Sequence, residues 1–407
     1  MRIFLNVLKI SSFVILALLI LVILLILGSF IAYKIWIGKA PPIPKEPVIH
    51  AHNNPDTEGT TYETQAELIA AMGVGWNAGN TLDMPMGAKF HSQPILQKEL
   101  FVKIKNLGFD SIRIPMTWHP YASEAPDYVI DPQRLARAKQ VVDQALEAGL
   151  IVIINSHHDN SKYTPTPENA ENAVNFVGKI WSQIAEVFKD YDQNLIFEPV
   201  NEPIIKGYEH EWCYFENCPD CIAKAKVIMD CNQAFINEVR KTGGRNESRY
   251  LLVKTVAPAP GNAVKILKKL PEDGAENKLI VAVQAYDPFD LVFQGDMKRS
   301  KVTAQDKWNL RMTFEELERT FVKKGVHVIY TEMGMTNKNN PEERYEWAKY
   351  FVSETKKRGI ACFVWDNGNT RAGVEGFGIV SKKTGKVFKE SQRYYEGLID
   401  GINKDNE

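Results

Sequence analysis

The chain has 407 residues and a mass of 46.1 kDa, and 49 Lys and Arg are balanced by 50 Asp and Glu, for a formal net charge of −1. This balance argues against a nucleic-acid-binding protein, which usually presents a basic face, and 44% hydrophobic residues exclude a globally disordered chain. The length permits one large domain or two of ordinary size, and five cysteines are too few for a disulfide-stapled scaffold.

The N-terminal segment differs from the rest of the chain. No charged residue occurs from Ile10 to Tyr33, and most positions are Leu, Ile, Val or Phe. A helix of this length, rising about 1.5 Å per residue, spans roughly 30 Å, which is the thickness of the hydrocarbon core of a bilayer. The apolar region of a cleaved signal peptide is shorter, usually about 7–15 residues. We therefore predict a transmembrane signal anchor at residues 10–33, after a cytosolic N-terminus at residues 1–9, with cleaved signal peptide as the alternative.

A proline-rich linker follows at residues 34–61. It contains Ala40-Pro41-Pro42-Ile43-Pro44-Lys45-Glu46-Pro47, and proline-dense chains are extended and semi-rigid. We expect this segment to hold a folded domain, residues 62–402, away from the membrane surface.

Within residues 62–402, short apolar runs alternate with longer stretches of helical periodicity, the pattern of a parallel α/β fold. Eight strand–helix units predict a (β/α)8 TIM barrel, and no G-x-G-x-x-G follows the first strand to favour an open doubly wound sheet. The predicted strands are Gly73–Trp76, Ser111–Pro115, Ile151–Ser156, Leu195–Val200, Tyr250–Thr255, Leu279–Ala285, Val326–Thr331 and Ile360–Trp365. The predicted helices are Gln93–Leu107, Pro132–Ala148, Ala170–Asp190, Ala223–Thr242, Ala263–Leu270, Thr313–Lys324, Pro341–Arg358 and Glu390–Leu398.

Polar residues are concentrated at the carboxyl ends of six predicted strands, where a barrel of this kind carries its active site. Such residues are costly to bury without partners, so their shared position indicates a functional cluster. They are Arg113, His157, His158, Asn201, Glu202, Gln284, Tyr286, Glu332, Trp365 and their immediate neighbours.

Two of these residues, Glu202 and Glu332, are carboxylates on the fourth and seventh strands. Paired carboxylates about 5–5.5 Å apart suit retaining glycoside hydrolysis, in which one is the nucleophile and the other is the acid/base. Arg113 and Tyr286 could keep one carboxylate ionised, while partial burial could keep the other protonated.

At these residues the chain resembles glycoside hydrolase family 5, the retaining β-glycanases, over nearly all of Met72–Leu398. The motifs are Gly75-Trp76-Asn77-Ala78-Gly79-Asn80-Thr81-Leu82-Asp83, Gly108-Phe109-Asp110-Ser111-Ile112-Arg113-Ile114-Pro115, Asn201-Glu202-Pro203 and Thr331-Glu332-Met333-Gly334. The resemblance implies that Glu332 is the nucleophile, that Glu202 is the acid/base, and that Asn201 binds the sugar 2-hydroxyl. It places Arg113, His157, Tyr286 and Trp365 on the remaining family positions, and it is strongest with the endoglucanase, xyloglucanase and lichenase subgroup.

One position departs from the family pattern, because Gln284-Ala285-Tyr286 replaces His-x-Tyr. Glutamine forms hydrogen bonds but cannot take a proton or carry positive charge. If the histidine chiefly positions the nucleophile and the tyrosine, Gln284 could substitute with some loss. If its charge matters, the protein could be a weakened enzyme or a surface glycan-binding protein.

Further residues are predicted to contact substrate. Trp365 could stack on a glucosyl ring, and Asn80, Trp118, His158 and Gln284 are candidate substrate contacts. For Trp118, core packing is the alternative. His157-His158-Asp159 could suggest a metal, but no third ligand follows at a useful spacing on the same strand.

Cys213, Cys218, Cys221 and Cys231 follow Glu202 with the spacing C-x4-C-x2-C-x9-C, and His210 precedes them. An oxidising exterior would favour one or two disulfides that pin this loop, whereas zinc binding and free thiols are the alternatives. Cys362, within the last strand, is expected to be a small buried hydrophobic residue.

The sequence therefore predicts a monomeric, membrane-anchored retaining endo-β-1,4-glucanase that needs no metal or organic cofactor. Because a β-glucan polysaccharide is too large to enter a cell, the barrel should be extracytoplasmic. Mannan or xyloglucan specificity is an alternative, since loop shapes choose the glycan. A metal-dependent barrel enzyme would need several acidic or His ligands at successive strand ends, and the fifth and eighth strands offer none that are convincing.

Overall fold

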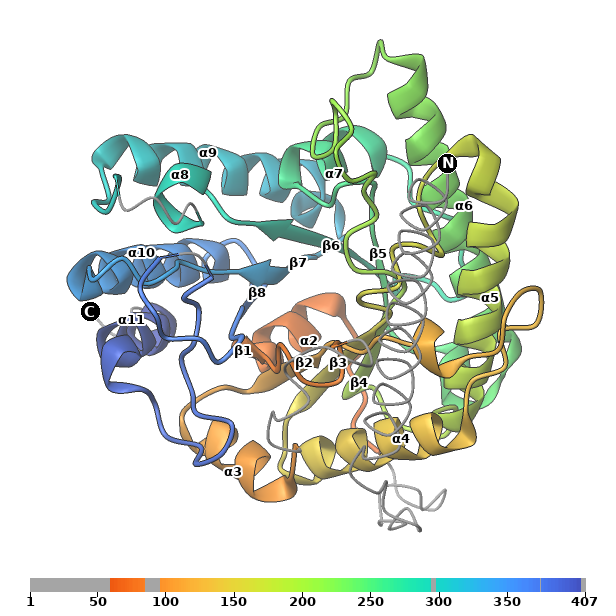
Figure 1. The fold of residues 1–407 in the computed structure, drawn as a ribbon, viewed down its shortest axis with the longest axis horizontal. Helices are drawn as coiled ribbons and strands as arrows, with labels where there is room; N and C mark the ends of the chain where they lie inside the picture. Colours follow the sequence, from red (N-terminus) through yellow and green to blue (C-terminus); the bar gives the residue numbers. More distant parts are fainter. Residues whose placement is uncertain (1–58, 85–95, 294–297, 374, 404–407) are drawn as a thin grey trace, which may run out of the picture. The chain divides into compact units, whose positions relative to one another are not determined.

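The computed structural model describes residues 59–84, 96–293, 298–373 and 375–403 (Figure 1). The predicted anchor at residues 10–33, the predicted cytosolic segment and nearly all of the predicted linker lie outside these ranges. Within them, no helix is both long enough and apolar enough to cross a membrane.

Eight parallel strands form a closed barrel in sequence order, with β1 paired to both β2 and β8 (Figure 1). The predicted (β/α)8 barrel is confirmed, and most strand ends lie within two residues of their predicted positions. The strands are β1 (Val74–Asn77), β2 (Ser111–Ile114), β3 (Ile151–Asn155), β4 (Leu195–Glu198), β5 (Leu251–Val253), β6 (Leu279–Ala285), β7 (Val328–Met333) and β8 (Ile360–Val364).

Helices surround the barrel, and two of them, α2 and α8, were not predicted. The helix α9 begins nine residues before the predicted Thr313, because Thr303 and Asp306 form a capping box that starts it at Ala304. The helices are α2 (Gln65–Met72), α3 (Lys98–Asn106), α4 (Pro132–Glu147), α5 (Ala170–Val187), α6 (Pro219–Lys241), α7 (Pro260–Ile266), α8 (Phe289–Val292), α9 (Ala304–Thr320), α10 (Pro341–Lys356) and α11 (Gln392–Asn403).

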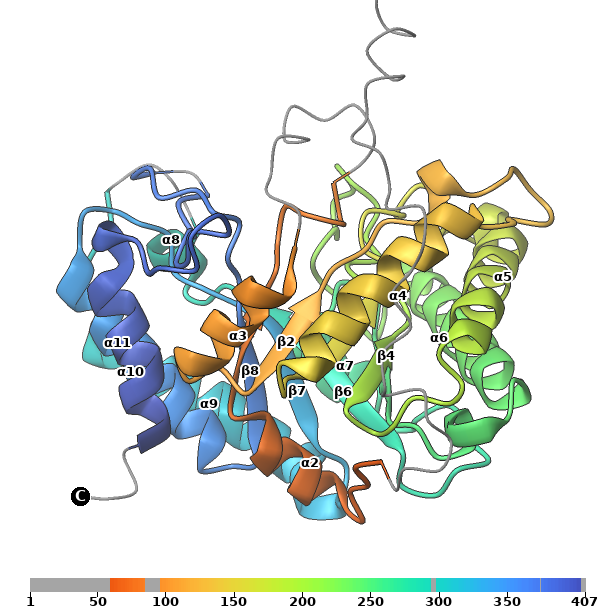
Figure 2. The ribbon, with the colours of Figure 1, turned by 90° about the horizontal axis from the view of Figure 1, so that it is seen from below.

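The helix α2 closes the amino-terminal end of the barrel, where Figure 2 shows it below the strands. Its apolar residues Leu68, Ile69 and Met72 form one cluster with inward-facing strand residues such as Ile153 and Phe363. Burial of this end against a helix excludes water, so the opposite, carboxyl end of the barrel is the one left to bind a ligand.

The strand β7 contains a bulge directly before Glu332. Val283 of β6 pairs with Tyr330, but the next residue, Gln284, pairs with Glu332, so Thr331 is an extra residue. The pairing of β7 with β8 shifts in the same interval. A bulge redirects the side chains that follow it, and this one sets the direction of Glu332.

The loop cysteines differ from the prediction of disulfides, because the structure has them as free thiols. Cys213 is exposed, whereas Cys231 is completely buried in the main hydrophobic core instead of pinning the loop. Cys362 is buried in β8, as predicted.

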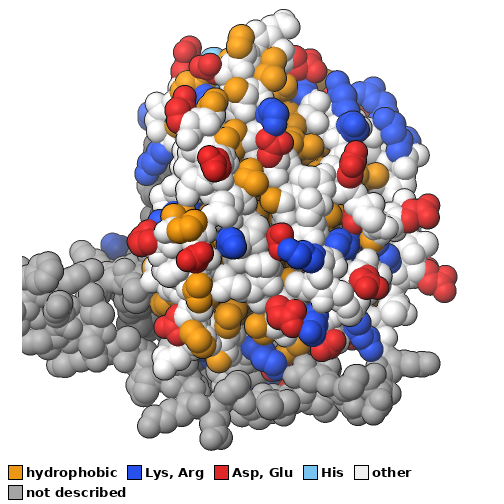
Figure 3. All heavy atoms as spheres, turned by 90° about the vertical axis from the view of Figure 1, so that its right-hand side faces the viewer, with side chains coloured by type: hydrophobic (Ala, Val, Ile, Leu, Met, Phe, Trp, Pro, Cys, Tyr) orange, Lys and Arg blue, Asp and Glu red, His pale blue; other side chains and the backbone are white. Residues whose placement is uncertain are grey.

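The face of the molecule at the right-hand side of Figure 1, where α5 and α6 lie, carries basic and acidic side chains interspersed (Figure 3). Neither sign of charge forms a continuous patch on this face, which agrees with the near-zero net charge.

Candidate active site

Arg113, from β2, lies at the centre of a buried polar network at the carboxyl end of the barrel. Its guanidinium donates to Glu198 and to Glu332, each over 2.6 Å, and to Asn201 Oδ1 over 2.8 Å. Burial alone would lower the pKa of Arg113, but the two carboxylates outweigh it and raise that pKa. The guanidinium is therefore a permanent cation that orients these three side chains and also Asn77.

Glu332 has a donor on each of its carboxylate oxygens. Arg113 Nη1 donates to Oε1 over 2.6 Å, and the Tyr286 hydroxyl donates to Oε2 over 3.0 Å. Removal from water and the nearby charge of Glu332 raise the pKa of Tyr286 well above 10, so the phenol stays protonated and acts as a donor. These charge-assisted bonds stabilise an ionised Glu332 carboxylate, the form that attacks an electrophile.

Glu202, four residues after the end of β4, is in a contrasting environment. Burial, followed by the charge of Glu332, raises the pKa of Glu202 to about 8, and the opposing effects of Lys254 and Arg113 are smaller. At neutral pH this carboxyl is therefore mostly protonated and can donate a proton. Its side chain is only partly exposed.

Asn201 links the neighbouring side chains. Its Oδ1 accepts from Arg113 and from Gln284 Nε2, both over 2.8 Å, so its Nδ2 is directed toward His157 Nε2, at 3.5 Å. Burial, with the nearby His158, Arg113 and Lys254, lowers the pKa of His157 well below 6.5, and the imidazole is neutral. The predicted support residues Arg113, His157, Asn201 and Tyr286 therefore lie in one network with Glu332.

Trp365 follows β8 and is partly exposed beside this network. Its ring is parallel to that of His157, with 5.8 Å between centroids and an interplanar angle of 4°. Glycine is required at position 79, because a Cβ there would lie 2.7 Å from Trp365 Cη2. Asn80 is partly exposed next to that glycine, and the His158 side chain is 45% exposed, so both are accessible to a ligand.

Trp118 does not fit the predicted role in substrate binding. Its side chain has no exposed surface and lies in the main hydrophobic core, and its Nε1 donates to the Asn155 carbonyl over 2.9 Å. A ring that is buried on both faces cannot stack on a sugar. Trp118 is a core residue, so the predicted substrate contact is wrong and the core-packing alternative is confirmed.

Three buried polar residues of the network were not predicted as functional. Lys254, which follows β5, pairs with Glu198 over 2.6 Å, and Asn77 of β1 accepts from Arg113 over 3.0 Å. Burial raises the pKa of Glu198, but Arg113 and Lys254 outweigh it and lower that pKa. Glu198 and Lys254 are each a charged residue at the end of an apolar strand, and that pattern in the sequence could have indicated their place in the network.

Among the residues that the structure describes, one candidate metal group lies at this end of the barrel, in which ligand atoms of Asp83, His157 and His158 lie within 4.8 Å of one another. The Asp83 carboxylate, however, accepts the backbone N–H groups of Asn80 and Thr81. The ring nitrogens of His157 lie beside the side-chain amides of Asn155 and Asn201. Hydrogen bonds therefore account for the positions of Asp83 and His157.

The comparisons with known proteins agree on one family. The model of the cellulase family, glycosyl hydrolase family 5, matches residues 71–371. The chain is 36% identical over 321 residues (78% of its length) to the cellulase/esterase CelE of Acetivibrio thermocellus. It is 33% identical over 351 residues (82%) to endoglucanase A of Clostridium longisporum. It spans 38% of the length of the former and 65% of the latter.

Among solved structures, a broad-specificity endoglucanase of Ruminococcus champanellensis with bound cellotriose has the same fold. The TM-score is 0.77 at 31% identity, and the alignment covers 84% of this chain and 100% of that one.

Proposed function

The chain belongs to glycoside hydrolase family 5, and from that premise we propose that it is a retaining endo-β-1,4-glucanase with Glu332 as nucleophile and Glu202 as acid/base. The observation that carries this assignment is the contrast between the two carboxyl groups. Glu332 is held by Arg113 and Tyr286, whereas burial raises the pKa of Glu202 to about 8. Two carboxyl groups with opposite protonation are what retaining hydrolysis needs.

In the first step, a Glu332 oxygen attacks the anomeric carbon while Glu202 gives its proton to the departing glycosidic oxygen. The bond from Glu332 to the sugar forms as the glycosidic bond breaks, and the released chain leaves as an alcohol. Glu332 loses its charge in the covalent intermediate, so its hydrogen bonds from Arg113 and Tyr286 weaken. When the bond between Glu332 and the sugar breaks in the second step, the two donors stabilise the returning carboxylate charge.

In the second step, the ionised Glu202 takes a proton from water, and the oxygen of that water attacks the anomeric carbon. The sugar is released with retained configuration, and both carboxyl groups return to their starting states. No metal or organic cofactor enters either step.

Asn201 and Trp365 are proposed to position the sugar. The Asn201 amide is held by Arg113 and Gln284 on its oxygen, which leaves its Nδ2 as a donor for a sugar hydroxyl. The partly exposed Trp365 ring offers an apolar face for a glucosyl ring, and the accessible Asn80 and His158 follow β1 and β3 at the same end of the barrel.

A β-glucan is the proposed substrate because the relatives are named as cellulases and endoglucanases, and one solved relative holds cellotriose. The rival function, glycan binding without turnover, rested on Gln284. The hydrogen bond from Gln284 to Asn201, together with both carboxyl groups in suitable environments, favours turnover.

The proposed location is extracytoplasmic, with residues 10–33 as the membrane anchor, since a polysaccharide must be cut outside the cell. The apolar composition of that segment supports this proposal. We further propose that the protein acts as a monomer.

Reducing-end release on carboxymethylcellulose, lichenan, xyloglucan and mannan tests the proposed function. We expect turnover on the first two substrates and products that keep the β-anomeric configuration when followed by NMR. Inverted products, or hydrolysis of mannan alone, would contradict the assignment.

A further inference from the structure

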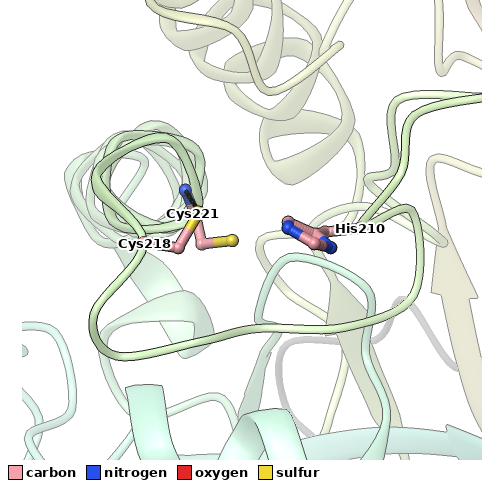
Figure 4. A group of neighbouring side chains, drawn as sticks. All are labelled: His210, Cys218 and Cys221. Carbon is pink, nitrogen blue, oxygen red and sulfur yellow. Dashed lines mark hydrogen bonds between the residues drawn. The ribbon is translucent and has the colours of Figure 1, made fainter.

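The loop between β4 and α6 contains a group of metal-binding side chains that the proposed catalysis does not use. Ligand atoms of His210, Cys218 and Cys221 all lie within 4.8 Å of one another. Figure 4 shows the His210 ring on the loop, facing the two thiols at the start of α6. His210 lies within the loop that begins after Glu202, and the two cysteines lie where this loop enters α6.

The local sequence holds both sulfur atoms at the same helix end. Cys218 is the N-cap residue of α6, and its Sγ accepts the backbone N–H of Cys221 over 3.2 Å. Pro219 at the first helical position favours this start. The spacing H-x2-C-x4-C-x2-C, which includes Cys213, resembles the short ligand spacing of structural zinc sites.

The imidazole of His210 is fixed by two aromatic neighbours. Its ring makes edge contacts with Tyr208 and with Phe215, at centroid distances of 5.6 and 4.9 Å. Cys218 N–H donates to the Phe215 carbonyl over 3.1 Å, which ties this aromatic contact to the start of α6. The histidine is therefore oriented before any ligand binds.

A buried cation beside the thiols gives an independent indication of a negatively charged ligand set. Lys224 follows Cys221 by three residues on α6, which places it on the same side of the helix. It is 8% exposed, and its Nζ has no hydrogen-bond acceptor among the described residues, although it lies over the Tyr208 ring. An unpaired buried ammonium is costly, and thiolate ligands would offset its charge.

We propose that His210, Cys218 and Cys221 bind a zinc ion that fastens the loop after Glu202 to the start of α6. Two thiolates and one imidazole are typical zinc ligands, and they favour zinc over magnesium or calcium, which take oxygen ligands. The fourth position of the tetrahedral ion is filled by water or by Cys213, which is exposed in the same loop.

The site stabilises a loop that also carries large exposed aromatic rings. Trp212 and Phe215 are 47% and 48% exposed, and Asn262 of α7 bonds the loop through the Trp212 carbonyl and the Tyr214 N–H. Zinc would add a second attachment, because its ligands His210 and Cys218 flank these rings in the sequence. Removal of zinc should therefore loosen residues 203–218 without altering the network around Glu332.

The test uses the full-length protein, purified under reducing conditions, with Zn²⁺ and Co²⁺ as probes. We expect one zinc ion per chain by mass spectrometry of the metal, and a thiolate-to-cobalt charge-transfer band after exchange. Cys218→Ser, Cys221→Ser and His210→Ala should each weaken zinc binding by about a hundredfold, because a tetrahedral site divides its binding free energy among four ligands.

The matched control is Cys231→Ala, which removes a thiol of the same helix outside the group and should leave zinc binding unchanged. Chelation should speed proteolysis within residues 203–218, while hydrolysis of a small aryl glucoside should persist. Absence of metal binding by the reduced protein would overturn the proposal, as would equal loss of zinc in Cys231→Ala. A disulfide between Cys218 and Cys221 in active protein that takes up no zinc after reduction would also overturn it.

Discussion

Gln284 Nε2 donates to Asn201 Oδ1 over 2.8 Å, and that same oxygen accepts from Arg113 Nη2 over 2.8 Å. In place of the family histidine, Gln284 was expected to help position the nucleophile and the tyrosine or to contact substrate. The structure instead joins it to the residue directly before Glu202. Gln284 therefore orients the side chain of Asn201. Two cations also bond to Asn201: Arg113 donates to its side-chain oxygen, and Lys254 Nζ donates to its backbone carbonyl.

Gln284→His should change kcat/KM by less than about threefold. If a charged histidine at this position stabilised the transition state by about 1.4 kcal/mol, the gain would be about tenfold. A ring nitrogen can still donate to Asn201, but Arg113 and Lys254 should keep the imidazole neutral, as they help to do for His157. Steady-state kinetics on a soluble β-glucan, repeated across pH, provide the measurement.

Gln284→Leu is the matched control, since it removes the bond to Asn201 at similar volume and should lower kcat/KM by about tenfold. A tenfold gain in Gln284→His, or a new ionisation in its pH profile, would show that charge at this position matters.

Glu332→Gln should lower kcat by about 10⁴-fold or more on every substrate, because no covalent intermediate can form. Glu202→Gln should lower polysaccharide turnover by about 10²–10⁴-fold but largely spare formation of the intermediate from aryl glycosides with good leaving groups. Burst kinetics with a dinitrophenyl glycoside separate the two variants. Equal losses on both substrate types, accompanied by unfolding, would instead indicate structural roles.

The pH dependence of kcat/KM should follow Glu202, whose pKa is raised by burial and by Glu332 to about 8. The general acid must be protonated, so activity is retained below that pKa and falls as the pH rises through about 8. Rates measured from pH 5 to 10 in the parent and in Glu202→Gln test this prediction. An alkaline limb that is unchanged in Glu202→Gln would assign it to another group.

Lys254→Met should lower the free energy of unfolding by about 3–5 kcal/mol, because it leaves the buried Glu198 with Arg113 as its remaining cation. Chemical denaturation provides the value. The double variant Lys254→Met/Glu198→Gln should lose less than the sum of the single losses, since the two side chains are in contact. Additive losses would mean that the ion pair contributes nothing.

A chain that begins at Gly59 should be soluble and as active as the full-length protein if residues 10–33 are the anchor. The start at Gly59 keeps the hydrogen bonds that the backbone N–H groups of Thr60 and Tyr62 donate to the side chains of Asp192 and Gln193, which fasten the segment to the barrel. Membrane fractionation and activity per mole are the measurements. Full-length protein found in the medium with a new N-terminus near residue 33 would identify a cleaved signal peptide.

The sequence by itself determined the barrel and several residues of the buried network, although it missed Glu198, Lys254 and Asn77. Alternating apolar strands and helical periods specify a parallel sheet, and parallel strands bring their carboxyl ends to one edge. Arg113, Asn201, Tyr286 and Glu332 meet there in the structure. Periodicity within each segment is a local property, so it could be read without knowledge of the neighbours.

Only the tertiary structure decided what each strand-end side chain contacts. The bulge at Thr331 sets the direction of Glu332, and burial makes Trp118 a core residue while Trp365 stays partly exposed. The pairing of Lys254 with Glu198 joins β5 to β4 through side chains 56 positions apart in the sequence. Exposure and charge pairing depend on atoms brought together from distant segments, which is why no local pattern could predict them.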